Sequence, residues 1–420
     1  MKTYFLGNVV QLFSHIFKGI DEELFLHGQR VAYILLKYLT EQGKYTDSEI
    51  SQMVQIAMLH DIGACKLEER LRKSMDTSIE LDNHSVCGYI FLENYTVYST
   101  EMAEICLYHH VQYDTYLKLE SRYKDISMLF SILNDVDEMY IEKLDLNIEQ
   151  SMSEIDGDFA KEVKKIFSKI NKDNKLGKKL SSGKYKEELN EYLDTIELSK
   201  EELELFVKML VQCNNFRSRG TLEHSITVEV LTYNLSKLLN IQREDMDTIL
   251  FAAFCHDIGK LITPVEILEK PAKLTYDEME IMKKHVNYTG EILRELGLEE
   301  VAVLAELHHE KLDGTGYPFG LKADEIPMEA KILAVADILS ALMEKRSYKE
   351  EFSKDRTLEI IQLMADDNKI DKNIVQVAVD NYDNLIDVCR RIGRKNKYKY
   401  KTMLRNYEEI IKKYNKIMNQ

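Results

Sequence analysis

The sequence predicts an all-α protein made of tandem helical bundles joined by a helical linker. Three observations lead to this fold class. The alternation of β-branched residues that marks a half-buried strand is nearly absent, while Leu, Ile, Lys and Glu recur at helical spacing throughout. A chain of 420 residues is long enough for two or three domains. Ten of the 11 histidines fall into two similar sets, which indicates a duplicated domain.

The composition limits the classes of protein and partner. Hydrophobic residues make up 45% and charged residues 30%, the balance of a globular chain. No apolar run approaches the roughly 18 residues of a membrane helix, and no secretory signal is visible at the N-terminus, so we expect a cytoplasmic protein without a membrane segment. The 6 cysteines stand singly and are expected to be reduced. A net charge of −16 disfavours nucleic acid as a partner.

Residues 1–145 are expected to form the first domain, because they contain the first histidine set. Its members are His27, His60, His84, His109 and His110. Residues 220–389, the second expected domain, carry a set in the same order: His224, His256, His285, His308 and His309. Asp-Ile-Gly follows the second histidine of each set, in "MLHDIGA" and in "FCHDIGK". The shared order and context indicate an internal duplication.

Five histidines in a recurring order favour a metal centre over a helical core with incidental histidines. Imidazole suits Fe, Mn and Zn, and a carboxylate beside a histidine can bridge two ions through its two oxygens. Adjacent His-Asp and His-His pairs on a helix point about 100° apart, so each pair can serve two ions or reach around one. Asp337 lies in an apolar helix expected over 330–343, where a carboxylate is costly unless it is also a ligand.

The remaining segments follow from local composition. Residues 146–219 are polar and rich in Lys and Glu, and we expect them to be the helical linker. In the second domain, an apolar stripe predicts a helix that contains Val228, Leu231, Leu235 and Leu238. All 4 prolines lie within 264–327, which predicts loops around a site. Residues 390–420 are strongly basic and predict a C-terminal helix, either solvated or docked on the protein's own acidic face.

The second half resembles the HD-GYP subgroup of the HD-domain phosphohydrolase superfamily, over about residues 224–380. The motifs that carry the resemblance are, in order, "HDIGKLITPVEILEKPAKLT", His285, "HHEKLDGTGYP" and "AKILAVAD". The resemblance implies an all-helical domain that holds Fe or Mn ions and hydrolyses cyclic dinucleotides, chiefly cyclic di-GMP. In this family two cations lower the pKa of a water between them, which then attacks phosphorus as an activated hydroxide.

The resemblance also implies a role for individual residues. One ion would be held by His224, His256, Asp257 and Asp337, and the second by Asp257, His285, His308 and His309. Two ions are expected, because the glutamate of a third-metal site is replaced by Gly220. The catalytic residues would be Asp257, as the bridge, and Lys260, whose charge can stabilise phosphate oxygens. Substrate binding would involve Lys260 together with the loop residues Asp313, Gly314, Gly316, Tyr317 and Pro318.

Several positions in the two halves depart from the family pattern or stay open. Ser340 stands where the family often has a further Asp, which leaves the hydrogen bond of that Asp open. In the first half, Ala64 replaces the lysine, "DTYLKL" replaces the glycine loop, and the last acidic ligand could be Asn134, Asp135 or Asp137. We expect a diverged HD repeat with a regulatory or scaffolding role and a second candidate metal site, formed by His27, His60, Asp61, His84, His109 and His110.

The sequence thus predicts a metal-dependent phosphodiesterase, most specifically a cyclic di-GMP phosphodiesterase, with a signalling protein or a second copy of the chain as a possible partner. Three alternatives stay open: another nucleotide phosphohydrolase, a di-iron oxygenase of the same superfamily, and a non-catalytic module that binds a cyclic dinucleotide. The sequence also leaves open Fe against Mn, cyclic di-GMP against cyclic GMP-AMP, and a linear dinucleotide against mononucleotide product.

Overall fold

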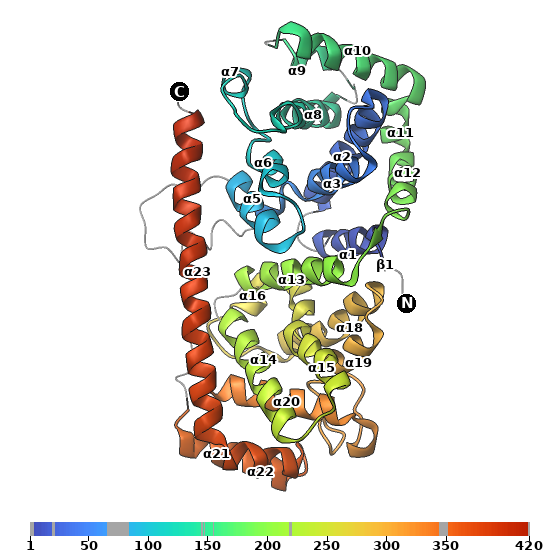
Figure 1. Cartoon of the computed structure of the whole chain (residues 1–420). Coiled ribbons are helices and arrows are strands. Elements are labelled where there is room, and N and C mark those ends of the chain that lie inside the picture. The colour runs from blue at the N-terminus through green and yellow to red at the C-terminus, as the bar shows by residue number, and fades with distance from the viewer. Residues whose placement is uncertain are drawn as a thin grey trace. The chain divides into compact units, whose positions relative to one another are not determined.

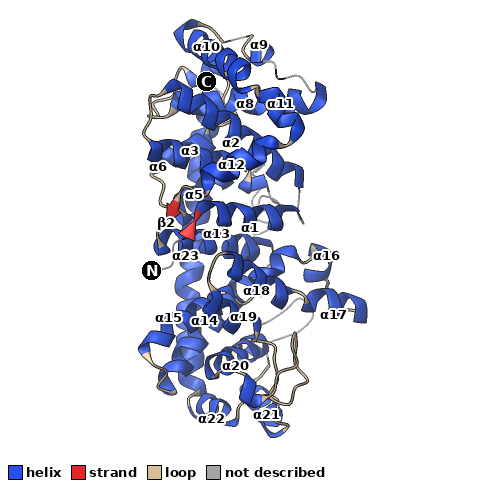
Figure 2. Ribbon diagram, turned by 90° about the vertical axis from the view of Figure 1, so that its right-hand side faces the viewer, coloured by secondary structure: helices blue, strands red, loops and turns tan. Residues whose placement is uncertain are grey.

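The computed structural model describes residues 4–18, 22–64, 84–143, 146, 148–153, 155–217, 221–343 and 352–418. These residues are mostly helical (Figures 1 and 2), and their one sheet is an antiparallel pair of two-residue strands, β1 (Tyr4–Phe5) and β2 (Glu197–Leu198). The all-α prediction is confirmed. None of the described helices combines the length and the apolar character needed to cross a membrane. The chain divides into unit 1 (Met1–Met209 and Met403–Gln420) and unit 2 (Leu210–Thr402).

Unit 1 is organised around a buried helix, α2 (Glu22–Gln42), which packs against α3, α8, α10 and α12. A capping box starts α3: Thr46 Oγ1 accepts from the Glu49 amide, and the Glu49 carboxylate accepts from the Thr46 amide. The other elements of its first part are α1 (Leu6–Lys18), α3 (Asp47–Leu59), η1 (Ile62–Ala64), α5 (His84–Tyr95), α6 (Thr100–Leu107), α7 (Tyr113–Tyr116) and α8 (Lys124–Lys143).

The segment expected as a linker is helical, and up to Met209 it is grouped with unit 1. Its elements are α9 (Ile148–Ser151), α10 (Gly157–Asn174), α11 (Leu176–Ser182), α12 (Lys184–Leu193) and α13 (Lys200–Arg217). Although the segment is polar overall, Val163, Phe167 and Ile170 form a buried stripe on α10. This stripe explains the packing of α10 on α2. The domain bounds of the sequence analysis themselves stay a prediction.

Unit 2 places α14 against α15 and α20, and α18 against α19 and η2. The expected apolar helix is α20, and the expected stripe lies on α14, where Val228, Leu231 and Leu235 are buried and Leu238, the last residue of the helix, is exposed. The elements are α14 (Thr221–Leu238), α15 (Arg243–Cys255), η2 (Ile258–Ile262), α16 (Val265–Leu268), α17 (Tyr276–Lys283), α18 (His285–Glu295), α19 (Glu299–Glu306), η3 (Ala323–Glu325), α20 (Met328–Met343), α21 (Lys354–Asp366) and α22 (Lys372–Asp380).

The basic C-terminal segment is part of a long helix, α23 (Tyr382–Met418). Its last residues, from Met403, belong to unit 1. There Ile411 and Tyr414 are buried, and the Tyr414 ring stacks on Tyr108 with 6.4 Å between centroids. The end of this helix is therefore docked on unit 1 through apolar and aromatic side chains, and is not solvated on all sides.

Candidate metal centres

Close backbone packing brings the second and third histidines of unit 2 together. His256 and Asp257 follow the end of α15, and Gly259 lies in the short helix η2. A Cβ atom on Gly259 would lie 2.0 Å from the carbonyl oxygen of His285, so only glycine allows α18 to start this close. Thr289 fixes the same contact, because its Oγ1 accepts from the Gly259 amide and donates to the His256 carbonyl, both at 3.0 Å.

The Asp257 carboxylate lies between two groups of imidazoles in unit 2. Its Oδ2 is 3.3 Å from His256 Nε2 and 3.8 Å from His224 Nε2. Its Oδ1 is 3.4 Å from His285 Nε2 and 4.0 Å from His308 Nε2. Asp337 completes the cluster, with Oδ1 3.1 Å from His224 Nε2 and Oδ2 3.8 Å from His309 Nδ1. The structure brings together all seven residues that the sequence analysis selected as ligands: His224, His256, Asp257, His285, His308, His309 and Asp337.

Backbone carbonyls orient three of these imidazoles. The Nδ1 atoms of His256, His285 and His308 lie 2.8, 2.6 and 2.6 Å from the carbonyl oxygen three residues earlier in each case. Because a carbonyl can only accept, each Nδ1 carries the proton and each Nε2 presents a lone pair toward Asp257. The same outer bond on His224 comes from Ser340, whose Oγ lies 3.0 Å from His224 Nδ1. The hydrogen bond that the sequence left open is thus supplied by the serine.

The electrostatics of the cluster favour the protonation states that a metal requires. Burial lowers the pKa of His285 to about 4 and that of His309 to about 3. Burial alone would raise the pKa of Asp257, yet the Lys260 ammonium and the His256 ring hold it well below its usual range. At neutral pH these two imidazoles are therefore neutral and the Asp257 carboxylate is charged.

The metal-free protein is expected to lose stability as the pH falls from about 6.5 to about 4. In this range the folded chain keeps His285 neutral, with its pKa near 4, while an unfolded histidine gains a proton. The unfolded state then binds more protons, so acidification lowers the free energy of unfolding, by up to about 3 kcal/mol for His285. Urea unfolding of chelator-treated protein at both pH values measures this change. An unchanged free energy would contradict the buried neutral histidine.

Among the residues that the structure describes, three buried atoms at the centre of the cluster have no hydrogen-bond partner: Asp257 Oδ1, His285 Nε2 and His308 Nε2. Leaving buried polar atoms unpaired costs about 1–3 kcal/mol each, more for a charged group. A divalent cation among them would satisfy all three. The donor set of imidazoles and carboxylates fits Fe, Mn or Zn, so the residues present fit a resident metal.

Lys260 and Tyr317 lie at this cluster, and Asp313 does not face it. Lys260 Nζ is 2.5 Å from Asp257 Oδ2. The Tyr317 ring lies against His309, with 4.9 Å between centroids. Asp313 Oδ1 instead accepts from the Thr315 amide and hydroxyl, which closes a turn within the loop.

The two loop glycines are needed for different reasons. Gly314 has φ +81°, which favours glycine. A Cβ atom on Gly316 would lie 2.3 Å from the Lys311 amide nitrogen, so this position needs glycine because the backbone comes close. The loop ends in Pro318, which is half-buried.

The sequence analysis missed Glu310, which holds the loop in shape. This residue is buried, and its carboxylate accepts from the amides of Phe319, Gly320 and Leu321 at 2.7, 3.1 and 3.0 Å. Its place directly after the paired histidines was the signal that could have identified it. Three converging amides explain how an acidic residue is tolerated in the interior.

Unit 1 repeats the same arrangement around Asp61. Its Oδ2 is 3.5 Å from His60 Nε2 and 3.9 Å from His27 Nε2, and its Oδ1 is 3.3 Å from His84 Nε2 and 3.6 Å from His109 Nε2. His110 joins through its Nε2, 2.9 Å from His84 Nε2. The structure brings together all the residues of the second candidate site: His27, His60, Asp61, His84, His109 and His110.

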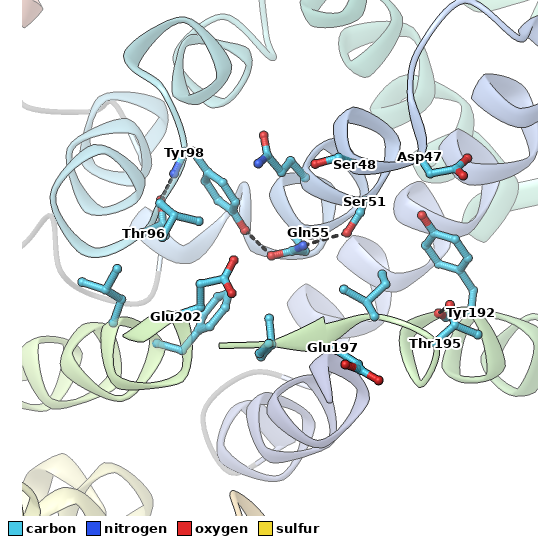
Figure 3. Close-up of a pocket in the computed structure, with 16 residues that line it drawn as sticks. Asp47, Ser48, Ser51, Gln55, Thr96, Tyr98, Tyr192, Thr195, Glu197 and Glu202 are labelled. Carbon is cyan, nitrogen blue, oxygen red and sulfur yellow. Dashed lines mark hydrogen bonds between the residues drawn. The ribbon is translucent and has the colours of Figure 1, made fainter. Parts of the chain in front are cut away.

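A pocket of about 580 Å³ in unit 1 contains no residue of either cluster (Figure 3). It is lined by polar side chains, among them Gln55 and Tyr98, whose hydroxyl donates to Gln55 Oε1 at 2.6 Å. Its acidic residues are Asp47, Glu197 and Glu202. This pocket is therefore separate from both histidine clusters.

Comparison with known proteins agrees with the geometry of unit 2. The HD domain family matches residues 202–374, which include all seven clustered ligand residues. Residues 202–374 thus carry an HD domain. A solved structure described as a cyclic GMP-AMP specific phosphodiesterase of V. cholerae has the same fold, with a TM-score of 0.51 over 93% of this chain and 98% of that chain. The two sequences are 18% identical, so this likeness concerns the fold alone.

Curated relatives of the HD domain are cyclic dinucleotide phosphodiesterases by name. The 3'3'-cGAMP-specific phosphodiesterase 1 of Vibrio cholerae is 27% identical over 86% of this chain and 88% of its own length. The 3'3'-cGAMP-specific phosphodiesterase 2 of the same organism is 36% identical over 48% of this chain. The cyclic di-GMP phosphodiesterase response regulator RpfG of Xanthomonas campestris is 38% identical over 36% of this chain. The chain spans only 38% and 40% of these last two proteins.

Proposed function

We propose that the HD domain is a metal-dependent phosphodiesterase that hydrolyses cyclic dinucleotides at the cluster around Asp257. One observation carries the proposal: the two oxygens of Asp257 face two separate pairs of imidazoles, as a carboxylate that bridges two ions must. Fe or Mn are the ions we propose. The names of the relatives support the reaction class and the substrate class.

Cyclic di-GMP is the substrate we propose first, and 3′3′-cGAMP is the second candidate. The second rests on a specific observation, because the relative that matches over 86% of this chain is named for cGAMP. Cyclic di-GMP is the substrate that appears in the name of the relative from Xanthomonas campestris. Both are cyclic dinucleotides that contain guanine, and the half-buried Tyr317 ring beside His309 is the aromatic group that we propose stacks on this base.

When bound, a pair of divalent ions supplies an acidified water and neutralises phosphate charge. The protein's own residues prepare this chemistry. Backbone carbonyls and Ser340 fix the orientation of the imidazoles, and Asp257 stays ionised. The Lys260 ammonium, on a flexible stem, can move from Asp257 to a non-bridging phosphate oxygen of the substrate. The Tyr317 ring and its loop, held by Glu310, border the cluster where a base would lie.

Turnover assays on anaerobically purified, full-length protein test the proposal. Protein loaded with Fe²⁺ or Mn²⁺ is incubated with cyclic di-GMP, 3′3′-cGAMP and cyclic di-AMP, and the products are separated by chromatography. The proposal expects metal-dependent formation of linear dinucleotide or mononucleotide from at least one guanine-containing substrate. Binding without turnover in every metal would instead favour a non-catalytic module. A cytoplasmic location and a signalling partner or homodimer stay predictions.

Replacing Ser340 by alanine is expected to weaken metal binding by about 10–100-fold, the usual effect of losing an outer hydrogen bond to a ligand histidine. Without Ser340 Oγ, the His224 ring loses the partner that sets its orientation. Competition with a fluorescent chelator measures the affinity. Thr357→Ala is the matched control, because Thr357 is also a buried hydroxyl residue of unit 2 and lies outside the cluster. Equal affinities for the two variants would contradict the role of Ser340.

A further inference from the structure

We infer that unit 1 holds a second dinuclear metal centre around Asp61, in which the ion at His27 and His60 is bound more weakly than the ion at His84, His109 and His110. The inference does not depend on the function proposed for the HD domain. It rests on four features of unit 1: the orientation of its imidazoles, the convergence of three ring nitrogens, the surroundings of Asp61, and the position of one carboxylate.

The imidazoles of unit 1 are oriented as ligands. His60 Nδ1 lies 2.7 Å from the Ala57 carbonyl oxygen and His109 Nδ1 lies 2.5 Å from that of Cys106, so both rings present a lone pair at Nε2. His60 is 1% exposed, and its Nε2 has no hydrogen-bond partner in the described ranges of the chain. This buried lone pair points to the Asp61 carboxylate, 3.5 Å away, without a proton between them. A cation would satisfy both atoms.

Three ring nitrogens converge at the other side of Asp61. His84 Nε2 lies 3.1 Å from His109 Nε2 and 2.9 Å from His110 Nε2. His84 can share only one proton or one lone pair at that nitrogen, so it cannot satisfy both neighbours. A divalent ion accepts the lone pairs of all three rings together with Asp61 Oδ1, which lies 3.3 Å from His84 Nε2.

Within the described part of unit 1, the carboxylate of Asp61 has no lysine partner. In unit 2, the Lys260 ammonium contacts Asp257. The matching position in unit 1 is Ala64. Among the described residues, the ion-pair partners of Asp61 are histidines alone: His27, His60, His84 and His109.

The acidic residue near the first histidine occupies a different helix position in each unit. Asp137 lies 2.8 Å from His27 Nδ1, just as Ser340 lies 3.0 Å from His224 Nδ1, so these two residues correspond. Three residues earlier on each helix stand Asn134 and Asp337, which therefore also correspond. Asn134 is 2% exposed, and neither its Oδ1 nor its Nδ2 has a hydrogen-bond partner among the described side chains and backbone. Unit 1 thus offers the metal a neutral amide where unit 2 offers a carboxylate.

Asp137, the carboxylate that contacts His27 Nδ1, makes up only in part for the charge that Asn134 lacks. Asp137 is paired with Arg30 through two hydrogen bonds of 2.7 and 2.9 Å, so much of its charge is already balanced. The ion at His27 and His60 would contact one carboxylate, Asp61, and two imidazoles, whereas the other ion would contact Asp61 and three imidazoles. The smaller number of donors explains the weaker binding of the first ion. The difference expected is on the order of 10–100-fold in affinity.

Counting bound ions in full-length variants tests the centre. Asp257→Ala is the background, since it removes the bridging carboxylate of unit 2. This variant, stripped with a chelator and dialysed against Mn²⁺, should bind about two more ions than the double variant Asp257→Ala with Asp61→Ala. Mn²⁺ should also raise the thermal unfolding midpoint of the single variant more than that of the double variant. Equal ion counts in the two proteins would overturn the inference.

The order of binding is tested in the same background. Asn134→Asp should strengthen the weaker Mn²⁺ step by about tenfold or more, because it restores the missing charge. Asp135→Asn is the control, since Asp135 is an exposed neighbour on the same helix, and it should leave both steps unchanged. His110→Ala removes an exposed imidazole of the second ion's group and should weaken only the tighter step. No effect of Asn134→Asp, or weakening of both steps by His110→Ala, would refute the assignment.

Discussion

Replacing Asp257 by alanine is expected to abolish the proposed hydrolysis of cyclic dinucleotides by the HD domain. Each oxygen of this carboxylate faces a different pair of imidazoles, so the variant deprives both ions of their shared counter-charge. The loss should exceed the roughly 10²–10³-fold cost of removing a single charge-stabilising group. Turnover at saturating Mn²⁺ and the number of bound ions are measured together.

The control for this variant is Asp277→Ala, which removes an exposed carboxylate on α17 of the same unit. It should keep wild-type turnover and metal content. If Asp257→Ala retained more than about a tenth of the wild-type turnover at saturating metal, the bridging role of this carboxylate would be wrong. His256→Ala should behave as Asp257→Ala does, because it removes an imidazole that faces the same carboxylate oxygen.

Much of the candidate site could be predicted because metal chemistry restricts residue type and order. The bridging aspartate must directly follow a histidine. The residue two positions after this aspartate must be glycine, because a side chain there would keep the next histidine from approaching. Such local requirements are visible in a sequence. The recurrence of "HDIG" in both halves therefore identified Asp61 and Asp257 correctly as residues that lie among histidines.

The last acidic position of unit 1 could not be predicted, because three polar residues lie within one helical turn. Asp135 lies on the exposed face of α8, whereas Asn134 and Asp137, three residues apart, share the buried face, and only the rotation of the helix decides which face reaches the histidines. The structure places Asp137 behind His27 and leaves Asp135 exposed. The role of Glu310 escaped prediction for a similar reason, since the three amides that it binds come together only in the folded loop.

The polar segment 146–209 shows how composition can hide packing. Its Lys and Glu content suggested a linker, yet an average over the segment takes no account of the helical period. Val163, Phe167 and Ile170 recur at three- and four-residue spacing and are buried on one face of α10. The contact of α10 with α2 depends on this stripe, while the basic and acidic side chains cover the opposite face.

The Lys260 ammonium lies where it contacts the Asp257 carboxylate, and with a metal bound at the cluster it could contact a substrate phosphate. Its Nζ lies 2.5 Å from Asp257 Oδ2, the oxygen that also faces His256 and His224. The Lys260 side chain is 21% exposed, so it is partly accessible to solvent. A cation at the cluster would compete with the ammonium for Asp257, and the flexible stem allows Lys260 to turn toward a phosphate instead.

Lys260→Ala should therefore lower turnover by about 10²–10³-fold, the typical cost of losing one donor that stabilises developing charge, while metal content stays unchanged. Single-turnover rates and metal analysis on the same preparation measure the two effects separately. Lys260→Arg should recover part of the rate, because it keeps the positive charge. Lys273→Ala, an exposed lysine of the same unit, is the control and should leave both quantities unchanged. Loss of metal together with activity in Lys260→Ala would show that Lys260 acts by organising Asp257, and its role toward the phosphate would then be wrong.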